Sequence, residues 1–489
     1  MSAARIRVRS SDWFAGPWQL YEALGSPVPR VLLESARSGV PAGRYSILAE
    51  DPFLIFRYKG GLASLSGPRI GSRTLRTDDP LTLLQKLLRT YRSETSDGLP
   101  PFASGAIGYL SYECKDWLLP RCQTRLRSQL ELPEAYFLFF DRSIVWDHQK
   151  NQMLFCQADL PDVPGPRPSL ENWERECRAA LSIRKARSSV SMPAEEPCVM
   201  DINCSMRQDE YEEAVRRIQS EIRSGEIFQA NLAHRFEFAL PQGAREAYRR
   251  LREVNPSPFF GLLEAEDFEI VSGSPERLLR LEGRALETRP IAGTRRRGKD
   301  RRQDEDLSTE LLLSEKERAE HVMLVDLERN DLGRVCAYGS VHVDEFLTLE
   351  DYSHVKHIVS NVRGTLQEGS DAIDALRAFF PGGTITGAPK IRCMQIIDEV
   401  ETVPRGPYTG SLGYLSFAGG MDFNILIRSL VVKDGRATLH VGAGIVADSD
   451  PEKEYHETLY KAEAVLQAVF GAENVHAFFR DRGLAARVS

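Results

Sequence analysis

The chain has 489 residues, which is enough for one large domain or two of ordinary size with a buried core. Its 42% hydrophobic and 27% charged residues are typical of a globular protein. The formal net charge of −7 argues against general binding of nucleic acid, so any anion site must be a local concentration of cations.

The cysteines and the hydrophobic runs indicate the compartment. The eight cysteines are scattered and include no C-x-x-C pair, which favours reduced thiols over disulfides or a structural zinc site. No uninterrupted apolar segment is long enough to cross a bilayer, and the positive N-terminus has no apolar run behind it. We therefore expect a cytoplasmic protein that binds neither nucleic acid nor membrane.

The first part of the chain combines short strands with few helices. Strand signals fill residues 30–61 and recur at 105–112 and 135–147, while a leucine stripe predicts a helix over Leu81–Tyr91. Between 159 and 196, proline-rich flanks enclose a charged helix near 171–187, which indicates a linker between domains. We predict one domain over residues 1–196, including the linker, with the boundary near Pro197.

The second part continues the mixture. An amphipathic helix is expected at Asp209–Ser224, a long one at Ser308–Leu327 and another from Asp371 to Pro381. A last helix begins after Ser449-Asp450-Pro451, a good N-cap with proline in the first turn. With strand signals between these helices, we predict an α+β fold, a second domain over residues 197–472 and a tail over 473–489.

Two E-x-x-E pairs lie on expected helices, Glu317/Glu320 and Glu454/Glu457. Residues three apart share a helix face, so each pair presents two carboxylates in one direction, and two such faces would suit Mg²⁺. By spacing alone, two solvated acidic faces are the more common explanation. Lys461, four residues after Glu457, would then be a surface ion-pair partner.

The run Glu287–Gly298, E-T-R-P-I-A-G-T-R-R-R-G, is a candidate anion site. It reads as a strand that breaks at Pro290 and turns at Gly293, followed by Thr294 and three arginines. Bare backbone N–H groups and a hydroxyl at such a turn can bind a small anion.

Two glycine-rich segments and a histidine pair complete the candidates. F-F-P-G-G-T-I-T-G-A-P-K (379–390) could meet an anion at a helix N-terminus, and V-G-A-G-I-V (441–446) indicates close backbone approach or a bulge. Tight turns and packing explain either segment equally well. His354 and His357 would face opposite sides of a strand, so they do not form an obvious metal pair. The residues alone leave two hypotheses: a Mg²⁺-dependent enzyme acting on a carboxylate, or an acidic binding subunit of a larger complex.

The segment Arg207 to Phe470 closely resembles the chorismate-utilising enzymes, which include anthranilate synthase component I, aminodeoxychorismate synthase component I, and the isochorismate and salicylate synthases. The resemblance lies in S-G-S-P-E-R, R-P-I-A-G-T-R-R-R-G, S-E-K-E-R-A-E-H-V-M-L-V-D-L-E-R-N-D-L-G-R-V, P-G-G-T-I-T-G-A-P-K and V-G-A-G-I-V-A-D-S-D-P-E-K-E-Y-H-E-T. Residues 1–196 resemble the N-terminal domain of the two aminating subunits through L-L-E-S, R-Y-S-I-L and D-P-F. The resemblance implies a large mixed or antiparallel β-sandwich core with helices packed outside, and a chorismate-binding catalytic domain over 197–472.

The resemblance also implies roles for single residues. Glu276 is similar to the acid that protonates the departing C4 hydroxyl of chorismate, and His357 to a histidine near the reacting ring. Glu320 and Glu457 would be the Mg²⁺ ligands. Glu317 and Glu454 would support them or bind the metal through water. This metal would neutralise the ring carboxylate. The residues that hold the substrate's carboxylates would be Thr294, Tyr408, Arg428, Gly442, Ala443, Gly444 and Lys461.

Gln229, in G-E-I-F-Q-A-N-L, distinguishes the branches of the family. Isochorismate and salicylate synthases carry a lysine at this position, where it activates water, so glutamine implies amination with ammonia as the nucleophile. The chain has no glutaminase cysteine motif, and the resemblance therefore implies a separate glutamine amidotransferase subunit in a heterodimer.

Two aminating activities remain open. Aminodeoxychorismate synthase component I, on the route to para-aminobenzoate and folate, places nitrogen at C4; anthranilate synthase component I, on the route to tryptophan, places it at C2 and eliminates pyruvate. S-P-E-R, G-G-T-I-T-G-A-P-K-I-R, G-S-L-G-Y-L-S-F and M-D-F-N-I favour the first. Ala292 stands against it, because well-known aminodeoxychorismate synthases have a lysine there that attacks C2, although some proteins that resemble them also lack it.

L-L-E-S (Leu32–Ser35) and N-P-S-P-F (Asn255–Phe259) resemble the tryptophan pocket of the family, which gives feedback inhibition in anthranilate synthases. A core strand followed by a turn explains the same letters equally well. The candidate residues of this pocket are Glu34, Ser35 and Pro256.

Overall fold

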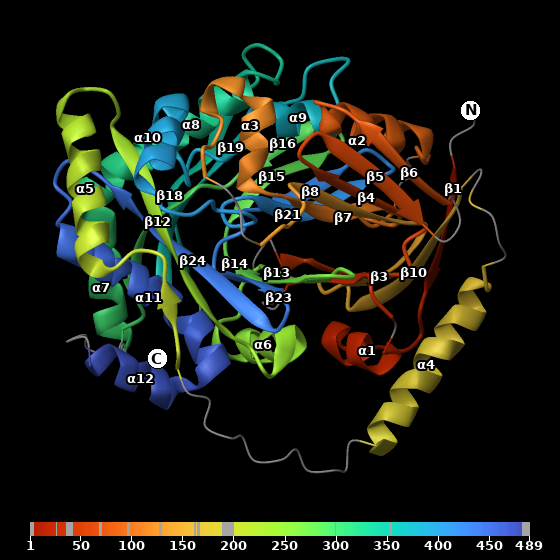
Figure 1. The fold of residues 1–489 in the computed structure, drawn as a ribbon. Coiled ribbons are helices and arrows are strands. Elements are labelled where there is room, and N and C mark those ends of the chain that lie inside the picture. The colour runs from red at the N-terminus through yellow and green to blue at the C-terminus, as the bar shows by residue number, and fades with distance from the viewer. Residues whose placement is uncertain are drawn as a thin grey trace.

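Two antiparallel sheets form the centre of the molecule (Figure 1). The computed structural model describes residues 4–25, 27–35, 43–67, 71–94, 98–126, 130–160, 163, 167–187, 200–298, 300–351 and 355–481. Within them the first sheet contains, in spatial order, β1 (Arg5–Ser10), β10 (Gln152–Asp159), β9 (Arg142–Asp147), β3 (Tyr45–Glu50), β2 (Arg30–Glu34), β13 (Phe259–Glu264), β14 (Glu269–Ser274), β23 (Ser429–Lys433), β24 (Arg436–Ile445), β12 (Gln229–Ala239) and β11 (Asn203–Cys204), with β20 (Gly387–Ala388) paired to β12.

The second sheet is built in the same way. Its strands are, in spatial order, β17 (Ile291–Arg296), β19 (Val355–Thr365), β16 (Ala285–Thr288), β15 (Arg277–Glu282), β22 (Met421–Asn424), β21 (Ser411–Ser416), β7 (Gly105–Leu110), β8 (Ala135–Phe140), β4 (Leu54–Lys59), β5 (Leu62–Gly67) and β6 (Gly71–Arg76), with β18 (His342–Asp351) paired to β19.

Both sheets contain strands from both parts of the chain. In the first sheet β2 pairs with β13, which places Leu32 opposite Leu262, and in the second β7 pairs with β21, which places Gly108 opposite Gly413. The two segments expected as separate domains therefore complete the same two sheets. The expected boundary near Pro197 lies outside the described residues.

A buried apolar layer between the sheets confirms the expected β-sandwich. It contains Ile107 and Leu412 from the second sheet together with Leu263 and Val431 from the first. All six residues of β8 are buried, which explains why A-Y-F-L-F-F is a continuous apolar run instead of an alternating one.

Helices cover the outer faces of both sheets, as Figure 1 shows. Their bounds are α1 Pro17–Leu24, α2 Pro80–Thr90, α3 Lys115–Leu118, α4 Leu170–Arg187, α5 Gln208–Arg223, α6 Gly243–Val254, α7 Arg301–Leu313, α8 Glu315–Gly333, α9 Ala372–Phe379, α10 Lys390–Val400, α11 Pro451–Phe470 and α12 Ala472–Arg480. Helices α5, α6 and α11 bury apolar side chains such as Tyr248 and Leu466 against the first sheet. Helices α2, α8 and α9 do the same on the second sheet, for example with Leu84 and Val325.

The expected single helix over Ser308–Leu327 is wrong. The chain ends α7 at Leu313, and the Ser314 hydroxyl then caps α8 by accepting from the backbone N–H of Glu317 at 3.4 Å. This break sets the direction of α8 independently of α7. At the other end of the chain, part of the expected tail forms α12, and its Phe479 is buried in the core.

Candidate active site

The side-chain amide of Gln229 connects the first sheet to helix α8. Gln229 opens β12, and its Nε2 donates to Glu320 Oε1 at 3.1 Å. On the neighbouring strand β24, a Cβ at Gly444 would lie 2.4 Å from Gln229 Nε2, so only a bare backbone leaves the amide in place. Gln229 Oε1 is buried without a hydrogen-bond partner among the described residues. A buried open acceptor of this kind suits a donor that arrives with a ligand.

Helix α8 presents Glu317 and Glu320 one turn apart, next to strand β17. Glu317 Oε1 accepts from Arg295 Nη1 at 3.0 Å, and a Cβ at Gly293 would lie 3.0 Å from Glu317 Oε2. Gly293 has φ of 67° and sits at a bulge of β17, a conformation that favours glycine. The run Glu287–Gly298 therefore meets the carboxylates through the Gly293 backbone, and Arg295 is occupied by a carboxylate.

The strand partner of the run is β19. His357 lies opposite Thr294 in the register, and its ring Nδ1 is 3.4 Å from the carbonyl oxygen of Gly293. Ala292, on β17, is buried. The side chain of Thr294 and all of His354 lie outside the described part of the chain.

Helix α11 brings the second pair of carboxylates. Glu454 is buried and accepts from Ser449 Oγ at 2.7 Å, whereas Glu457 is half-exposed and pairs with Lys461 Nζ at 2.9 Å. Lys461 Nζ also donates to the carbonyl oxygen of Gly442 at 3.0 Å. One cation thus joins the helix to the glycine-rich strand β24.

The charges of this cluster influence one another. Burial raises the pKa of Glu320, and the negative charges of Glu317 and Glu457 raise it further, against the opposing effects of Gln229 and Lys461. Glu457 of α11 therefore lies close enough to Glu320 of α8 for their charges to repel, and a cation placed near both would relieve this repulsion.

The donor chemistry fits Mg²⁺. Among the described residues, no group of three or more His, Cys, Asp or Glu side chains gathers closely enough to form a complete metal site. Mg²⁺ does not need one, because it binds through one or two carboxylates together with substrate oxygens and water. Glu320 and Glu457 can supply those two carboxylates.

Glu276 is a buried carboxyl in the turn between β14 and β15. Its Oε1 has no hydrogen-bond partner within the described residues. Burial raises the pKa of Glu276 to about 7, against the opposing effects of the Thr384 hydroxyl and the positive charges of Arg428 and Lys461. A carboxyl with this pKa carries its proton in a large share of molecules at neutral pH, as a general acid requires.

The backbone is strained at Arg428 and at Thr409, the residue after Tyr408. Arg428 has φ of 50° and Thr409 φ of 57°. For non-glycine residues such conformations cost roughly 1–3 kcal/mol each and occur mostly at functional sites. The Tyr408 ring stacks on His440 with 5.2 Å between centroids, and a Cβ at Gly442 would lie 2.8 Å from the Tyr408 hydroxyl. Burial raises the pKa of Tyr408 above its usual range, so the hydroxyl remains a neutral donor.

Sequence reasoning missed four residues that the structure brings to this place. They are Asn231, whose buried Oδ1 has no partner in the described chain; Thr384, beside Glu276; the buried Glu328; and the fully buried Arg405. One signal was available: Glu328 lies eight residues after Glu320, at the end of the expected helix.

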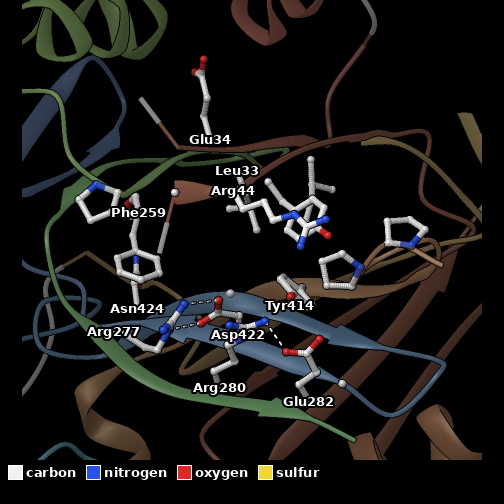
Figure 2. Close-up of a pocket in the computed structure, with 18 of the residues that line it drawn as sticks. Leu33, Glu34, Arg44, Phe259, Arg277, Arg280, Glu282, Tyr414, Asp422 and Asn424 are labelled. Carbon is white, nitrogen blue, oxygen red and sulfur yellow. Dashed lines mark hydrogen bonds and ion pairs between the residues drawn. The ribbon is translucent and has the colours of Figure 1, made fainter. Parts of the chain in front are cut away.

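A separate cavity of about 860 Å³ lies between the sheets, near the expected tryptophan pocket (Figure 2). Its lining includes Phe259 and Tyr414, and ion pairs of Arg277 with Asp422 and of Arg280 with Glu282 form one side. The carboxylates of α8 and α11 do not line it.

The expected pocket residues differ in their relation to this cavity. Glu34 borders it, but its carboxylate points away, accepting from Tyr248 Oη at 2.9 Å and from Arg252 Nη2 at 2.6 Å. Ser35 and Pro256 are not among the lining residues. A ligand in this cavity would therefore meet the ion pairs of the second sheet and not the Glu34 carboxylate.

Comparison with known proteins identifies the class to which this site belongs. Residues 42–467 match the family described as chorismate binding enzyme, and the chain belongs to that family. Aminodeoxychorismate synthase component 1 of Bacillus subtilis is 44% identical over 441 residues, covering 90% of this chain and 91% of that protein. Anthranilate synthase component 1 of Thermus thermophilus is 43% identical over 465 residues, covering 94% and 96%.

The fold also resembles that of a chorismate-binding enzyme of known structure. The crystal structure of anthranilate synthase component I from Streptococcus pneumoniae superposes with a TM-score of 0.74 at 32% identity, covering 88% of this chain and 93% of that one. In the described part of the chain, no helix is both long enough and apolar enough to span a membrane. Two differently named activities stand at nearly equal identity, so likeness alone does not select the product.

Proposed function

We propose that this chain is aminodeoxychorismate synthase component I, which aminates chorismate at C4 in a Mg²⁺-dependent reaction and yields 4-amino-4-deoxychorismate. The observation that carries amination is Gln229, bonded to Glu320 at the centre of the site. A neutral amide cannot act as the base that activates water, whereas ammonia is a nucleophile without activation. Ammonia therefore fits the site better than water.

The residues of the chain would divide the work between holding and protonating the substrate. Mg²⁺ held by Glu320 and Glu457, with Glu317 and Glu454 in support, would neutralise the ring carboxylate when bound. Arg428, Tyr408 and Lys461 would hold the enolpyruvyl carboxylate, together with the backbone around Gly442 and Gly444. Glu276 would give its proton to the C4 hydroxyl, which leaves as water. His357 would lie beside the ring.

The second candidate is anthranilate synthase component I. Ala292 favours it, because this buried position offers no amine that could attack C2. The sequence segments around Glu276 and the loop 379–390 favour the first candidate. In either case we propose a cytoplasmic enzyme that receives ammonia from a glutamine amidotransferase subunit, since the "component 1" names of its relatives imply a second subunit.

A product assay separates the two. The purified chain is incubated with chorismate, MgCl₂ and an ammonium salt, and the products are separated by chromatography. We expect 4-amino-4-deoxychorismate, which releases pyruvate and para-aminobenzoate only after a lyase is added. Fluorescent anthranilate with one pyruvate per chorismate, without lyase, would establish the second candidate. No loss of chorismate would overturn both.

A further inference from the structure

Glu328 is a buried carboxyl with no role in the site described so far. It lies on α8, eight residues after Glu320, which at 1.5 Å per residue is about 12 Å along the same helix face. Its side chain is 2% exposed, and its Oε2 has no hydrogen-bond partner among the described residues. An apolar side chain would fill this space without burying a polar atom, so packing alone does not account for a glutamate.

The loop 382–384 brings Glu328 and Glu276 together. A Cβ at Gly383 would lie 3.6 Å from Glu328 Oε1, and the hydroxyl of the next residue, Thr384, lies beside Glu276. The two carboxyls thus flank two consecutive residues of one loop. Each keeps one buried oxygen without a partner in the described chain, Oε1 of Glu276 and Oε2 of Glu328.

The surroundings of Glu328 favour its protonated form. Burial is the largest cause that raises its pKa well above the usual range, and the negative charges of Asp331 and Glu276 raise it further, while Lys390 opposes them. The Thr288 hydroxyl of β16 also contacts it. In its protonated form Glu328 can donate a proton, and in its carboxylate form it can accept one.

The next acidic residue on this face of α8 is Asp331, which connects Glu328 to a lysine nearer the surface. Asp331 follows Glu328 by one turn and forms an ion pair with Lys390 at the start of α10. Lys390 Nζ also donates to the carbonyl oxygen of Phe379 at 3.1 Å, and the lysine side chain keeps 12% of its surface exposed to solvent. Arg334 is the other cation near Asp331. A row of titratable groups thus runs from Glu276 through Glu328 and Asp331 to the surface.

We propose that Glu328 relays protons between Glu276 and the surface, by way of Asp331 and Lys390. The proposal rests on the proposed role of Glu276 as the acid. When the C4–O bond breaks, Glu276 gives its proton to the departing oxygen, water leaves, and a buried carboxylate remains. Glu328 passes its proton to Glu276, and solvent returns one to Glu328 along the row. The ammonia that forms the new C–N bond releases one proton, so the proton count balances over a turnover.

Glu328 acts through Glu276 and does not touch the substrate, so its test must separate proton transfer from structure. The variants are Glu328→Gln, which keeps the shape but cannot relay a proton, and Glu328→Ala, whose cavity admits formate. Asp326→Asn, on the exposed face of α8, is the matched control. Chorismate loss is measured with MgCl₂ and saturating ammonium salt from pH 6 to pH 9, in H₂O and in D₂O, and chorismate affinity is measured by calorimetry.

We expect Glu328→Gln to lower kcat by at least about tenfold, less than the roughly 10²–10⁴-fold contribution of a direct general acid. Chorismate affinity should not change. The loss of kcat should become larger as the pH rises, and the ratio of kcat in H₂O to kcat in D₂O should be larger for Glu328→Gln than for the wild type. Formate should restore turnover to Glu328→Ala in proportion to its concentration, which a structural role would not produce. Wild-type kcat and pH profile in Glu328→Gln, or no response of Glu328→Ala to formate, would overturn the relay. No chorismate loss by the wild-type chain would instead overturn the proposed function.

Discussion

Gln229 Nε2 donates to Glu320 Oε1 at 3.1 Å, so the residue expected to select the nucleophile is bonded to an expected metal ligand. This bond lowers the pKa of Glu320 against the larger effect of burial, which raises it. Under the proposed function, the choice of nucleophile and the charge of the metal site would therefore be coupled. A change at position 229 must alter both.

Gln229→Lys tests this coupling. The ammonium group would replace the amide beside Glu320 and compete with Mg²⁺ for its charge, so the concentration of Mg²⁺ needed for half-maximal turnover should rise. We expect ammonia-dependent turnover to fall roughly 100-fold, since a misplaced orienting contact can cost on that order. Chorismate loss without ammonium salt should appear as the pH rises, because the neutral amine form of the lysine can activate water. Gln208→Lys, at an exposed position of α5, is the control; unchanged amination in Gln229→Lys would contradict the expectation.

Glu320→Gln and Glu457→Gln test the metal assignment. Each substitution removes a negative charge from the cluster without changing its size, and turnover should fall roughly 100-fold or more, because a bound metal contributes several kcal/mol of charge stabilisation. Melting temperatures should stay close to the wild-type value. Glu452→Gln, exposed in the first turn of α11, should behave as wild type. Normal Mg²⁺-dependent rates in either variant would remove that residue from the metal site.

The pH dependence of turnover should follow Glu276. Only the protonated carboxyl can donate, and its pKa is raised to about 7 by burial, so the rate should decline as the pH rises through 7. Rates with ammonium salts must first be divided by the fraction present as ammonia, which increases with pH. Glu276→Gln should lose roughly 10²–10⁴-fold in turnover and the decline near pH 7 with it. A wild-type profile that stays flat to pH 9 after this correction would argue against Glu276 as the acid.

The same pKa predicts a change in stability. Because the folded pKa of about 7 exceeds the ordinary value of 4.5, the folded state binds more protons between these two pH values. Stability therefore falls as the pH rises from 4.5 to 7, and the penalty is complete above 7. Glu276→Gln removes it and should raise the free energy of unfolding at pH 8 by up to about 3 kcal/mol relative to wild type. Urea titrations at pH 5 and pH 8 would show the difference.

Many local elements and candidate site residues could be predicted from the sequence, but their arrangement in space could not. Helix periodicity places Glu317 with Glu320 and Glu454 with Glu457. It does not reveal that Glu454 is buried and Glu457 half-exposed, because burial depends on how the helix packs against the rest of the chain. Ser314 stands three residues before Glu317, a spacing that is typical of a helix N-cap. The helical pattern nevertheless continues across Ser314, so the break between α7 and α8 was not predicted.

Long-range contacts account for most of what the sequence did not reveal. The pairing of β2 with β13 joins residues more than two hundred positions apart, and no local pattern encodes it. The contact of Gly383 with Glu328, and of Thr384 with Glu276, likewise depends on how a loop folds back over α8. Residues of this kind look like ordinary surface or core positions until the chain is folded.

Substitution of Arg405 tests which contacts stabilise the loop that contains Tyr408. Its guanidinium is 1% exposed and donates to Glu401, to the carbonyl oxygens of Ile385 and Asn231, and to Thr409. Arg405→Ala leaves the Glu401 carboxylate buried without this partner, which should cost roughly 3–5 kcal/mol in the free energy of unfolding. Urea denaturation measures this loss. Arg436→Ala, which breaks an exposed pair, should cost less than about 1 kcal/mol; equal losses would contradict the role of Arg405.

Gly444→Ala and Gly442→Ala should separate catalysis from folding on one strand. A Cβ at Gly444 would lie 2.4 Å from Gln229 Nε2, the end of a flexible side chain, so the fold can adapt while the amide leaves Glu320. A Cβ at Gly442 would lie 2.8 Å from the backbone oxygen of Leu232 on β12, which cannot move without opening the sheet. We therefore expect Gly444→Ala to keep the melting temperature within a few degrees while turnover falls by about tenfold or more, as for a lost orienting contact. Gly442→Ala should lower the melting temperature itself. If Gly444→Ala kept wild-type turnover, the Gln229–Glu320 bond would not be needed for the reaction.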